Sequence, residues 1–389
     1  MDFPRITSIN IKGFKCFRDF SADFSEFEVF VGANGTGKTS LFDFLRFLRD
    51  GVKDKIPPGI ITGFLGQEVF NKSNKSEGDF FSWSLQFVNG NGLGILYEGE
   101  LKGPIGKIII NKEGIACPHW KRMDNINYDR LVNRNPDWAF EGDIRTYRGY
   151  NIGPNQLGLQ FPSEKNKAIN FLSDYIGSWG FYSSFEIDRS TMRRSIPIEQ
   201  HAELREDAGN ISAILFNLFT DHADIYDALQ GYIKQVIPGF RGLKIRARGG
   251  PGEVIAFWTE EGIKSELTMA DLSDGVLNFI IWATLCVHPN PPPLICIDEP
   301  EVGLHPRALP LLAGLLEQAT ERTQVFITTH SSYMLAQFPF QNITVMAKEN
   351  GEVVAKKPAS SKVLNAFLED FGQSDIEAMH RSEELETFS

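Results

Sequence analysis

The residues best suited to chemistry form a glycine-rich run at positions 32–39, Gly-Ala-Asn-Gly-Thr-Gly-Lys-Thr. Glycines let backbone N–H groups turn toward phosphate oxygens, and a following helix adds the partial positive charge of its N-terminus. Lys38 would reach the β- and γ-phosphates of a nucleotide, and the Thr39 hydroxyl would ligate Mg²⁺. We therefore predict a nucleotide site made by this set: Asn34, Gly35, Thr36, Gly37, Lys38, Thr39 and Ser40.

The elements on either side of this run are those that position a phosphate-binding loop. An apolar, β-prone segment at 27–31 precedes it. Apolar residues at helical spacing follow it: Leu41, Phe42, Leu45 and Leu48. Strand, glycine-rich loop and helix is the order that this motif requires. The alternative, a glycine-rich turn that binds nothing, is disfavoured by this context.

A second candidate is a pair of acids at the end of a buried strand. Residues 294–297 are apolar, and Asp298 and Glu299 follow them directly. The strand would place Asp298 at the carboxyl edge of a sheet, where it would hold Mg²⁺ directly or through water. Glu299 would orient or deprotonate an attacking water as the general base. The alternative is a strand that ends in a charged turn.

A third candidate is the turn Leu272-Ser273-Asp274-Gly275, which precedes a hydrophobic helix expected at 276–287. A serine hydroxyl and a helix N-terminus together form an anion site. We therefore predict an anion site at Ser273 and Gly275. Taken alone, these four residues also fit an ordinary helix N-cap.

The segments between these motifs predict a lobe of antiparallel strands and a group of helices. Alternating apolar residues and Asn-Gly turns at 80–115 predict a β-meander. Helical spacing predicts helices at 166–180 and 206–237. A core strand is expected at 179–187, and two or three more strands at 241–268.

Two polar stretches leave their interpretation open. Residues 116–165 interleave aromatic and arginine side chains, which can stack on nucleic-acid bases. The same residue types are ordinary in packed loops, and a surface for a partner protein is equally open. Arg189, Arg193 and Arg194 follow the strand at 179–187 and could face phosphate or nucleic acid.

Composition narrows the class of protein. The 389 residues carry a net charge of −11, which argues against a chain that coats itself in nucleic acid. The four cysteines lack the spacing of a metal site, which favours reduced thiols. The sequence shows no signal peptide and no apolar stretch of about 18 residues, so we expect a cytoplasmic protein without membrane contact.

The ordered set of motifs resembles the RecF/SMC-like ATPases of the ABC class. The segment Ile9-Asn10-Ile11-Lys12-Gly13-Phe14-Lys15-Cys16-Phe17 looks like the opening strand of that family. Residues 32–39, 272–275 and 298–299 follow in the order of its P-loop, signature and Walker B motifs. The resemblance assigns His330, in Thr-Thr-His-Ser, the switch role of contacting the γ-phosphate. It also makes Gln67 a candidate for the family's glutamine that contacts Mg²⁺ and water, with a surface-loop glutamine as the alternative.

The resemblance implies one ABC-type P-loop ATPase head over residues 1–389, of the α/β class. A mixed central sheet, an antiparallel β side lobe and a helical lobe are expected. The N-terminal P-loop lobe would span 1–70, and the inserted β-meander and helical lobe 71–240. The C-terminal lobe at 241–389 would carry the signature, Walker B and switch histidine. No heptad pattern is sustained, so the coiled-coil arm of SMC proteins is expected to be absent.

The resemblance also implies ATP and Mg²⁺ as cofactors and a homodimer with two ATP molecules between its heads. It implies a molecular switch in DNA repair or in defence against phage and other foreign DNA, with DNA as a candidate ligand. The alternative is a regulatory ATPase that holds or activates a separately encoded effector, a nuclease or toxin, without binding DNA. No nuclease motif is evident, which favours an effector partner. A transporter ATPase is disfavoured by the long insertion and by the LSDG form of the signature.

Overall fold

The computed structural model describes residues 4–54, 56, 70–71, 80–88, 92, 94–103, 109–117, 127–133, 144–146, 152–161, 167–199, 203–248 and 252–360. These residues divide into two compact units. Of the described residues, the first unit holds 4–179 and 341–360, and the second holds 180–340.

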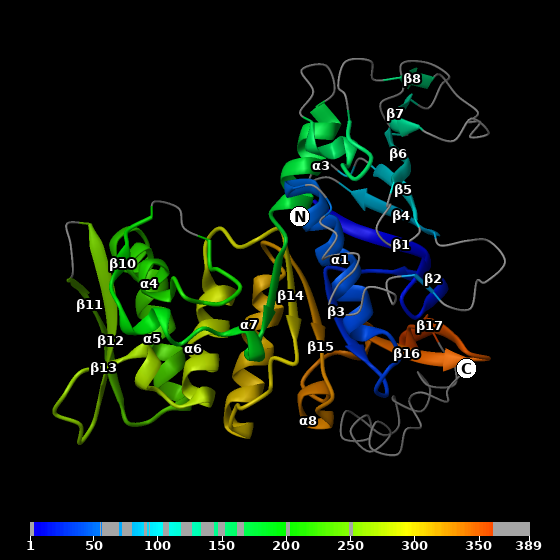
Figure 1. Ribbon diagram of the computed structural model, residues 1–389. Coiled ribbons are helices and arrows are strands. Elements are labelled where there is room, and N and C mark those ends of the chain that lie inside the picture. Colours follow the sequence, from blue (N-terminus) through cyan, green and yellow to red (C-terminus); the bar gives the residue numbers. More distant parts are fainter. Residues whose placement is uncertain are drawn as a thin grey trace. The chain divides into compact units, whose positions relative to one another are not determined.

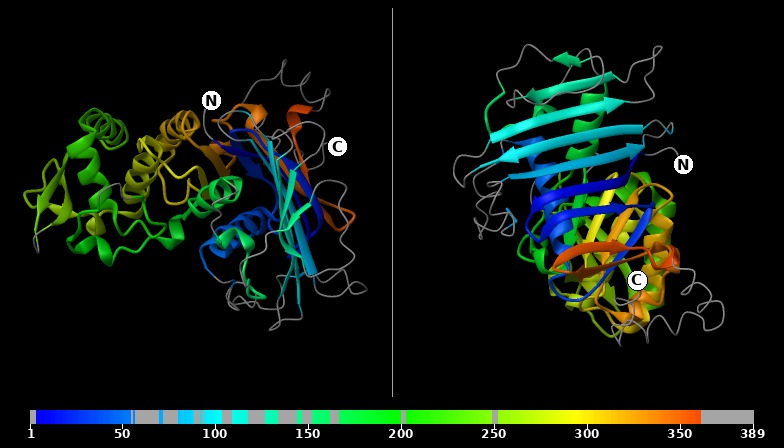
Figure 2. Two further views of the ribbon diagram at one scale, coloured as in Figure 1. Left: turned by 90° about the horizontal axis from the view of Figure 1, so that it is seen from above. Right: turned by 90° about the vertical axis from the view of Figure 1, so that its right-hand side faces the viewer.

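The first unit contains a seven-stranded sheet in the order β2-β1-β4-β5-β6-β7-β8. Its strands are β1 (Arg5–Phe14), β2 (Phe17–Asp23), β4 (Phe80–Val88), β5 (Gly94–Lys102), β6 (Ile109–Cys117), β7 (Asn127–Asn133) and β8 (Ile144–Thr146). Neighbouring strands from β2 to β7 are antiparallel, and β8 pairs with β7 in parallel. The right-hand view of Figure 2 shows these strands side by side. The predicted β-meander at 80–115 is confirmed as β4, β5 and β6.

The first unit also contains the strand and helix that flank the glycine-rich run. Strand β3 (Phe27–Val31) leads into the run, and helix α1 (Lys38–Lys53) begins at the single lysine of the run (Figure 1). Strand β16 (Ile343–Glu349) pairs with β3 in parallel and with β17 (Glu352–Lys356) antiparallel. This sheet is therefore mixed, as predicted, and β16 returns from far along the chain to lie beside β3.

An aromatic cluster attaches α1 to the seven-stranded sheet. Phe44 and Phe47 of α1 pack against Phe14 of β1 and Phe81 of β4, with ring centroids 5.2–6.5 Å apart. All four side chains are at most 3% exposed. Because α1 is fixed on this sheet and β3 is fixed beside β16, the loop between them is held at both ends. Helix α3 (Lys167–Gly177) also packs on α1.

The second unit contains the strand that ends in the two acids. Strand β14 (Leu294–Asp298) runs parallel to β15 (Gln324–Thr328) and to β9 (Gly180–Ser183). The register places Asp298 opposite Thr328 on one side and Ser183 on the other. Residues 294–297 are at most 1% exposed. The carboxyl ends of all three strands therefore meet at one edge, as predicted for the acids.

The strand predicted at 179–187 is shorter than expected. Strand β9 ends at Ser183, and residues 184–186 form a 3₁₀ turn. The Ser183 hydroxyl accepts a hydrogen bond from the backbone N–H of Phe185, which turns the chain away from the sheet. Phe185 and Ile187 are residue types that favour strands, but Phe185 lies in the turn and Ile187 directly follows it.

The remaining elements of the second unit are helices packed beside a small antiparallel sheet. The helices are α4 (Ile211–Asp221), α5 (Ala223–Val236), α6 (Asp274–Val287), α7 (Leu309–Ala319) and α8 (Ser332–Leu335). The small sheet contains β10 (Ile196–Pro197), β11 (Phe240–Ala247), β12 (Glu253–Glu260) and β13 (Leu267–Thr268). Helix α4 packs on β12, α5 on α6, and α6 on α7. The two helices predicted at 206–237 are confirmed.

Candidate functional site

The glycine-rich loop has a backbone shape that other residues adopt rarely. Gly32, Gly35 and Gly37 have φ values of +146°, +81° and +102°. A Cβ on Gly32 would lie 2.1 Å from the carbonyl oxygen of Met346, which belongs to β16. A Cβ on Gly37 would lie 2.9 Å from the Phe17 ring. The loop therefore requires glycine at both ends for space as well as for conformation.

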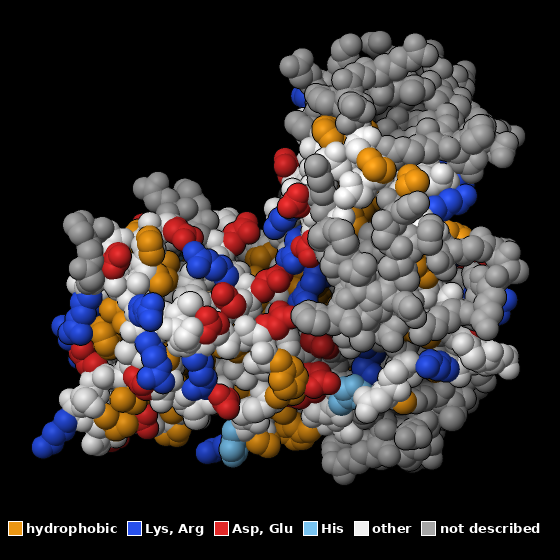
Figure 3. Space-filling model, in the orientation of Figure 1, with side chains coloured by type: hydrophobic (Ala, Val, Ile, Leu, Met, Phe, Trp, Pro, Cys, Tyr) orange, Lys and Arg blue, Asp and Glu red, His pale blue; other side chains and the backbone are white. Residues whose placement is uncertain are grey.

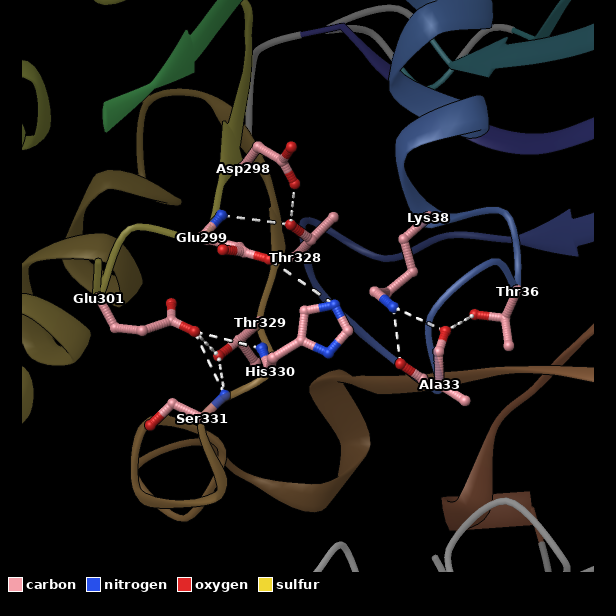
Figure 4. Close-up of polar contacts among 11 residues, drawn as sticks. Ala33, Thr36, Lys38, Asp298, Glu299, Glu301, Thr328, Thr329, His330 and Ser331 are labelled. Atoms are coloured by element: carbon pink, nitrogen blue, oxygen red, sulfur yellow. Dashed lines mark hydrogen bonds and ion pairs between the residues drawn. The ribbon is translucent and has the colours of Figure 1, made fainter. Parts of the chain in front are cut away.

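Lys38 bonds to the carbonyl groups of its own loop. Its ammonium donates to the carbonyl oxygens of Gly32 at 2.6 Å and Ala33 at 3.1 Å (Figure 4). The Ala33 carbonyl also accepts from the Thr36 hydroxyl at 2.9 Å. The Lys38 side chain is 6% exposed. These bonds keep a nearly buried ammonium satisfied and hold it inside the curve of the loop.

The start of α1 fits an anion. Gly37 is its N-cap, and among the described residues no side chain caps this end and no acid lies in its first turn. The helix dipole is therefore not compensated there by a carboxylate of the helix itself. Asn34, Gly35 and Thr39 are exposed and Ser40 is half-buried. The glycine cradle and the helix end suit the phosphates of a nucleotide.

The two acids of the second unit are bound to the end of the neighbouring strand. The Thr328 hydroxyl donates to Asp298 Oδ1. The backbone N–H of Glu299 lies 3.2 Å from both the carbonyl oxygen and the hydroxyl oxygen of Thr328. Glu299 adopts φ +50°, in the left-handed region that a non-glycine residue rarely occupies. These bonds hold Glu299 in that conformation, which turns the chain directly after the strand.

His330 lies close to Glu299. Its Nε2 is 3.6 Å from Glu299 Oε1, and the two side chains are 37% and 31% exposed. Figure 4 shows the imidazole beside the carboxylate, at the ends of β15 and β14. The structure therefore brings together the predicted Asp298, Glu299 and His330. A carboxylate that accepts a proton and an imidazole that donates one are suited to water activation and to a phosphate contact.

Glu301 is a residue of this cluster that the sequence analysis did not single out. Its Oε1 accepts from the Thr329 hydroxyl at 2.5 Å and from the backbone N–H groups of His330 and Ser331, each at 3.2 Å. Burial raises the pKa of the Glu301 carboxyl, and the nearby charge of Glu299 adds to this, whereas the donated hydrogen bonds oppose it. Glu301 thus holds the backbone that carries His330. Its position after Asp-Glu-Pro gives no sequence signal for that contact.

The turn at 272–275 forms the start of α6, which begins at Asp274 rather than at the expected 276. Ser273 is the N-cap residue, and within the described part of the chain its hydroxyl makes no capping bond. A Cβ on Gly275 would lie 2.3 Å from the carbonyl oxygen of Gly303. Asn278 of α6 donates to the Val302 carbonyl at 3.1 Å. The predicted signature turn therefore packs on the segment that follows the acids.

Some predicted features lie outside the described residues. Gln67 is one of them, as are most of the aromatic and arginine residues at 116–165. Within the described ranges no group of three or more His, Cys, Asp or Glu side chains is placed to hold a metal ion. None of the helices described is long and apolar enough to cross a membrane.

The visible surface of the second unit carries mixed charge. In Figure 3, Lys and Arg side chains on this unit alternate with Asp and Glu side chains. On the small sheet, Arg241 pairs with Glu261 at 2.6 Å, and Lys244 pairs with Glu266 at 3.6 Å. A continuous basic surface for nucleic acid is therefore not formed by these side chains.

Comparison with known families identifies the chain. Residues 118–336, more than half of the sequence, match one family profile. The chain belongs to the family described as "AAA domain, putative AbiEii toxin, Type IV TA system". A second profile, described as "AAA ATPase domain", matches residues 5–115 and so contains the glycine-rich loop. No curated protein matches the chain.

Solved structures show that the fold is that of SMC head domains. An SMC head bound to the C-winged helix domain of ScpA has a TM-score of 0.57 and 14% identity, over 90% of this chain and 97% of that one. A second SMC head has an extended coiled coil, is bound to the C-terminal domain of ScpA and is derived from Pyrococcus furiosus. It gives a TM-score of 0.57 at 13% identity, over 95% of this chain and all of that one.

The predicted resemblance is therefore confirmed for the fold, and the family profiles confirm an ATPase domain. The chain is an AAA-type ATPase domain with an SMC-head-like fold, and its P-loop implies ATP binding. The longest helix in the described residues, α1, has 16 residues, so no coiled-coil arm is apparent there.

Proposed function

We propose that the chain is an ATP-hydrolysing molecular switch that converts ATP and water to ADP and phosphate. The observation that carries this proposal is the approach of His330 to Glu299, 3.6 Å apart, at the ends of adjacent parallel strands. Glu299 is the general base that takes the proton of the attacking water. His330 donates to the γ-phosphate and responds to its loss.

The glycine-rich loop supplies the nucleotide contacts in this proposal. The ammonium of Lys38 leaves the carbonyls of Gly32 and Ala33 and binds the β- and γ-phosphates. The backbone N–H groups from Asn34 to Ser40 surround the phosphates. Thr39 and Asp298 supply oxygen ligands, the kind that Mg²⁺ prefers. When bound, Mg²⁺ would neutralise charge on the phosphates.

The signature turn acts in a second copy of the chain. We expect residues 1–389 to form one head, and two heads to meet head to tail around two ATP molecules. Ser273 and Gly275 of each copy would then contact the γ-phosphate held by the other copy's glycine-rich loop. The absence of a capping bond from the Ser273 hydroxyl in the described residues supports this role. ATP would join the dimer, and hydrolysis would release it.

Two variants test the switch. Glu299→Gln should reduce turnover by about 10²- to 10⁴-fold and accumulate an ATP-bound dimer, because the general base is lost while binding is kept. Ser273→Arg should abolish turnover and the dimer while the monomer still binds ATP. Turnover is followed by phosphate release and dimerisation by light scattering with ATP. Wild-type turnover in Glu299→Gln would refute the role of that residue, and a Ser273→Arg enzyme with normal turnover would refute the shared site.

The output of the switch is proposed to be DNA repair or defence against phage and other foreign DNA. The SMC-head-like fold supports a DNA-linked role by analogy alone. The test measures binding of duplex DNA to the ATP-trapped Glu299→Gln protein at low and high salt. Binding that depends on ATP and weakens with salt supports this output, and no binding at low salt contradicts it.

A second candidate is a regulatory ATPase that acts on a separately encoded effector. The family description names a putative toxin of a toxin–antitoxin system, which supports a role in such a system. Under this proposal the head controls a nuclease or toxin without binding DNA itself. The test expresses the chain with each neighbouring gene of its host and compares cell growth for wild type and Glu299→Gln. A neighbour whose toxicity depends on the Glu299 state supports the effector role, and toxicity that is the same with both contradicts it.

A further inference from the structure

The predicted γ-phosphate site of the second unit contains an acid. Asp274 is the first residue of α6, directly after Ser273, and its side chain is 81% exposed. A carboxylate at a helix N-terminus stabilises the helix. It also repels a phosphate bound at the same helix end, and the repulsion is stronger where water is excluded. The turn therefore needs a cation if it is to bind phosphate.

Arg189 is that cation in the structure. Its Nη2 forms an ion pair with Asp274 Oδ1. Its Nη1 donates to the Leu272 carbonyl at 2.7 Å and lies 3.4 Å from the Ala270 carbonyl. One guanidinium thus bonds to residues on both sides of Ser273. It fixes the backbone of the turn and places a positive charge beside the acid.

The segment that carries Arg189 is itself held in place. The carboxylate of Asp188 accepts from the backbone N–H of Ser190 at 2.8 Å, and the Thr191 hydroxyl donates to the Asp188 carbonyl at 3.0 Å. The backbone N–H of Asp188 donates to the Asp207 carbonyl at 3.0 Å. Arg189 therefore projects from an ordered turn. The sequence suggested that it could face phosphate or nucleic acid, whereas its side chain bonds to the signature turn.

We propose that Arg189 is a positioning residue that allows a phosphate-binding turn to contain an aspartate, Asp274. This proposal rests on the proposed function. Arg189 cancels the charge of Asp274, and it orients the backbone so that Ser273 and the start of α6 can accept the γ-phosphate of the opposite copy. The two side chains then act as one unit. Removing Arg189 alone exposes the phosphate to an unpaired carboxylate, and removing both charges largely restores the site.

A double-mutant cycle tests this pairing in the full chain. Arg189→Met should reduce ATP turnover by about 10- to 100-fold, the effect of one unpaired charge. ATP binding by the monomer should stay unchanged. Asp274→Asn removes the repelling charge from the turn and serves as the reference for the double variant. The double variant should recover to within about fivefold of Asp274→Asn, the remaining loss reflecting the backbone bonds of Arg189.

Two further measurements separate charge from general damage. The defect of Arg189→Met should shrink as salt rises from about 50 mM to 300 mM, because salt screens the Asp274 carboxylate. Arg205→Met serves as the control, since Arg205 pairs with Glu199 at 2.8 Å with both side chains exposed, and it should keep wild-type turnover. Thermal unfolding of each variant confirms that it is folded.

The outcomes distinguish this inference from the proposed function. A double variant as impaired as Arg189→Met, or an Arg189→Met enzyme with wild-type turnover, overturns the pairing. If Ser273→Arg abolishes turnover while the double variant fails to recover, only the inference about Arg189 fails. If Ser273→Arg leaves turnover intact, the shared phosphate site itself fails.

Discussion

The glycine-rich loop and the acid–histidine cluster are built in different ways. The loop at 32–39 takes its shape from the main chain, through three glycines with positive φ, and its lysine bonds to carbonyls of the same loop. The cluster is held by side chains. Thr328 bonds to Asp298 and Glu299, and Glu301 bonds to residues 329–331 of the neighbouring strand end.

This difference determines what a substitution does in each region. A loop shaped by its backbone fails when a side chain is added, because the added atoms have no space. A cluster held by side chains fails when an acceptor or donor is removed, because its partners stay behind without a bond. Substitutions of opposite kind therefore test the two regions.

Among the substitutions that compare these two regions, Gly32→Ala is expected to have the largest effect. The added Cβ would meet the Met346 carbonyl oxygen at 2.1 Å, so the loop or β16 must move. We expect ATP affinity to fall by at least about 100-fold, the scale of losing a phosphate donor. Nucleotide binding is measured by titration with a fluorescent ATP analogue, and stability by thermal unfolding.

Gly35→Ala is the matched variant for this prediction. Gly35 has φ +81°, but its nearest neighbour, the ammonium of Lys348, lies 3.9 Å from a Cβ position. We expect about 1–2 kcal/mol of strain and less than a tenfold loss of ATP affinity. Gly262→Ala, at φ +79° in open space of the second unit, controls for strain alone. Equal affinities for the Gly32 and Gly35 variants would show that space at Gly32 is not what shapes the loop.

The same difference explains what the sequence could predict. The loop, its strand and its helix are contiguous in the sequence, so residue types and their spacing were enough to predict them. The alternation of apolar and polar residues was enough to predict β4, β5 and β6. Asp298, Glu299 and His330 were found from their places at strand ends and from the resemblance. Glu301 and Arg189 were not assigned their contacts, because these depend on the register of β14 with β15 and on a turn about 80 residues from the signature.

The next effect in size is expected from Glu301→Ala. Removing the carboxylate takes an acceptor from the Thr329 hydroxyl and from the backbone N–H groups of His330 and Ser331. The Ser331 N–H keeps a bond to the Thr329 hydroxyl oxygen at 3.0 Å, whereas His330 loses a contact that fixes its position. A charge-assisted hydrogen bond is worth about 1.5–3 kcal/mol, so we expect kcat to fall by about 10- to 100-fold. KM for ATP should change less than threefold, because the glycine-rich loop is intact. Steady-state phosphate release at varied ATP measures both constants.

Two further variants make the Glu301 prediction specific. Glu301→Gln keeps an acceptor oxygen for the same donors, so its kcat should stay within about fivefold of wild type. Glu317→Ala, on the exposed side of α7, should leave both constants unchanged. A Glu301→Ala enzyme in which KM rises and kcat is unchanged would show that Glu301 does not act through the histidine.

The smallest expected effect concerns the hydrogen bonds of a buried side chain in the unit that carries the glycine-rich loop. Glu113 of β6 is fully buried and accepts from the Tyr97 hydroxyl at 3.0 Å and from the backbone N–H groups of Gly158 and Leu159. The next residue, Gln160, donates to the Gly51 carbonyl of α1 at 2.6 Å. A buried carboxylate thus supports the far end of the helix whose start forms the proposed phosphate site.

Burial raises the pKa of Glu113 to about 7 from an ordinary value of 4.5, although the donated hydrogen bonds oppose the shift. The folded protein therefore keeps this proton to higher pH than the unfolded chain. The stability that this contributes is fully present below pH 4.5 and is lost as pH rises to about 7. The difference of about 2.5 pH units corresponds to at most about 3 kcal/mol.

Glu113→Gln cannot ionise, so it should lack this pH dependence. We expect the free energy of unfolding of wild type, relative to the variant, to fall by up to about 3 kcal/mol between pH 5 and 8. Urea unfolding of both proteins at the two pH values measures it, and Glu352→Gln of β17, at a side chain that is 42% exposed and paired with Arg18, serves as the control. If the free energies of unfolding of wild type and Glu113→Gln change equally with pH, the raised pKa of Glu113 is contradicted. If ATP affinity changes together with stability, the Glu113 side chain also supports the glycine-rich loop, through α1. The contrast with the acid–histidine cluster would then be limited to the residues of the loop itself.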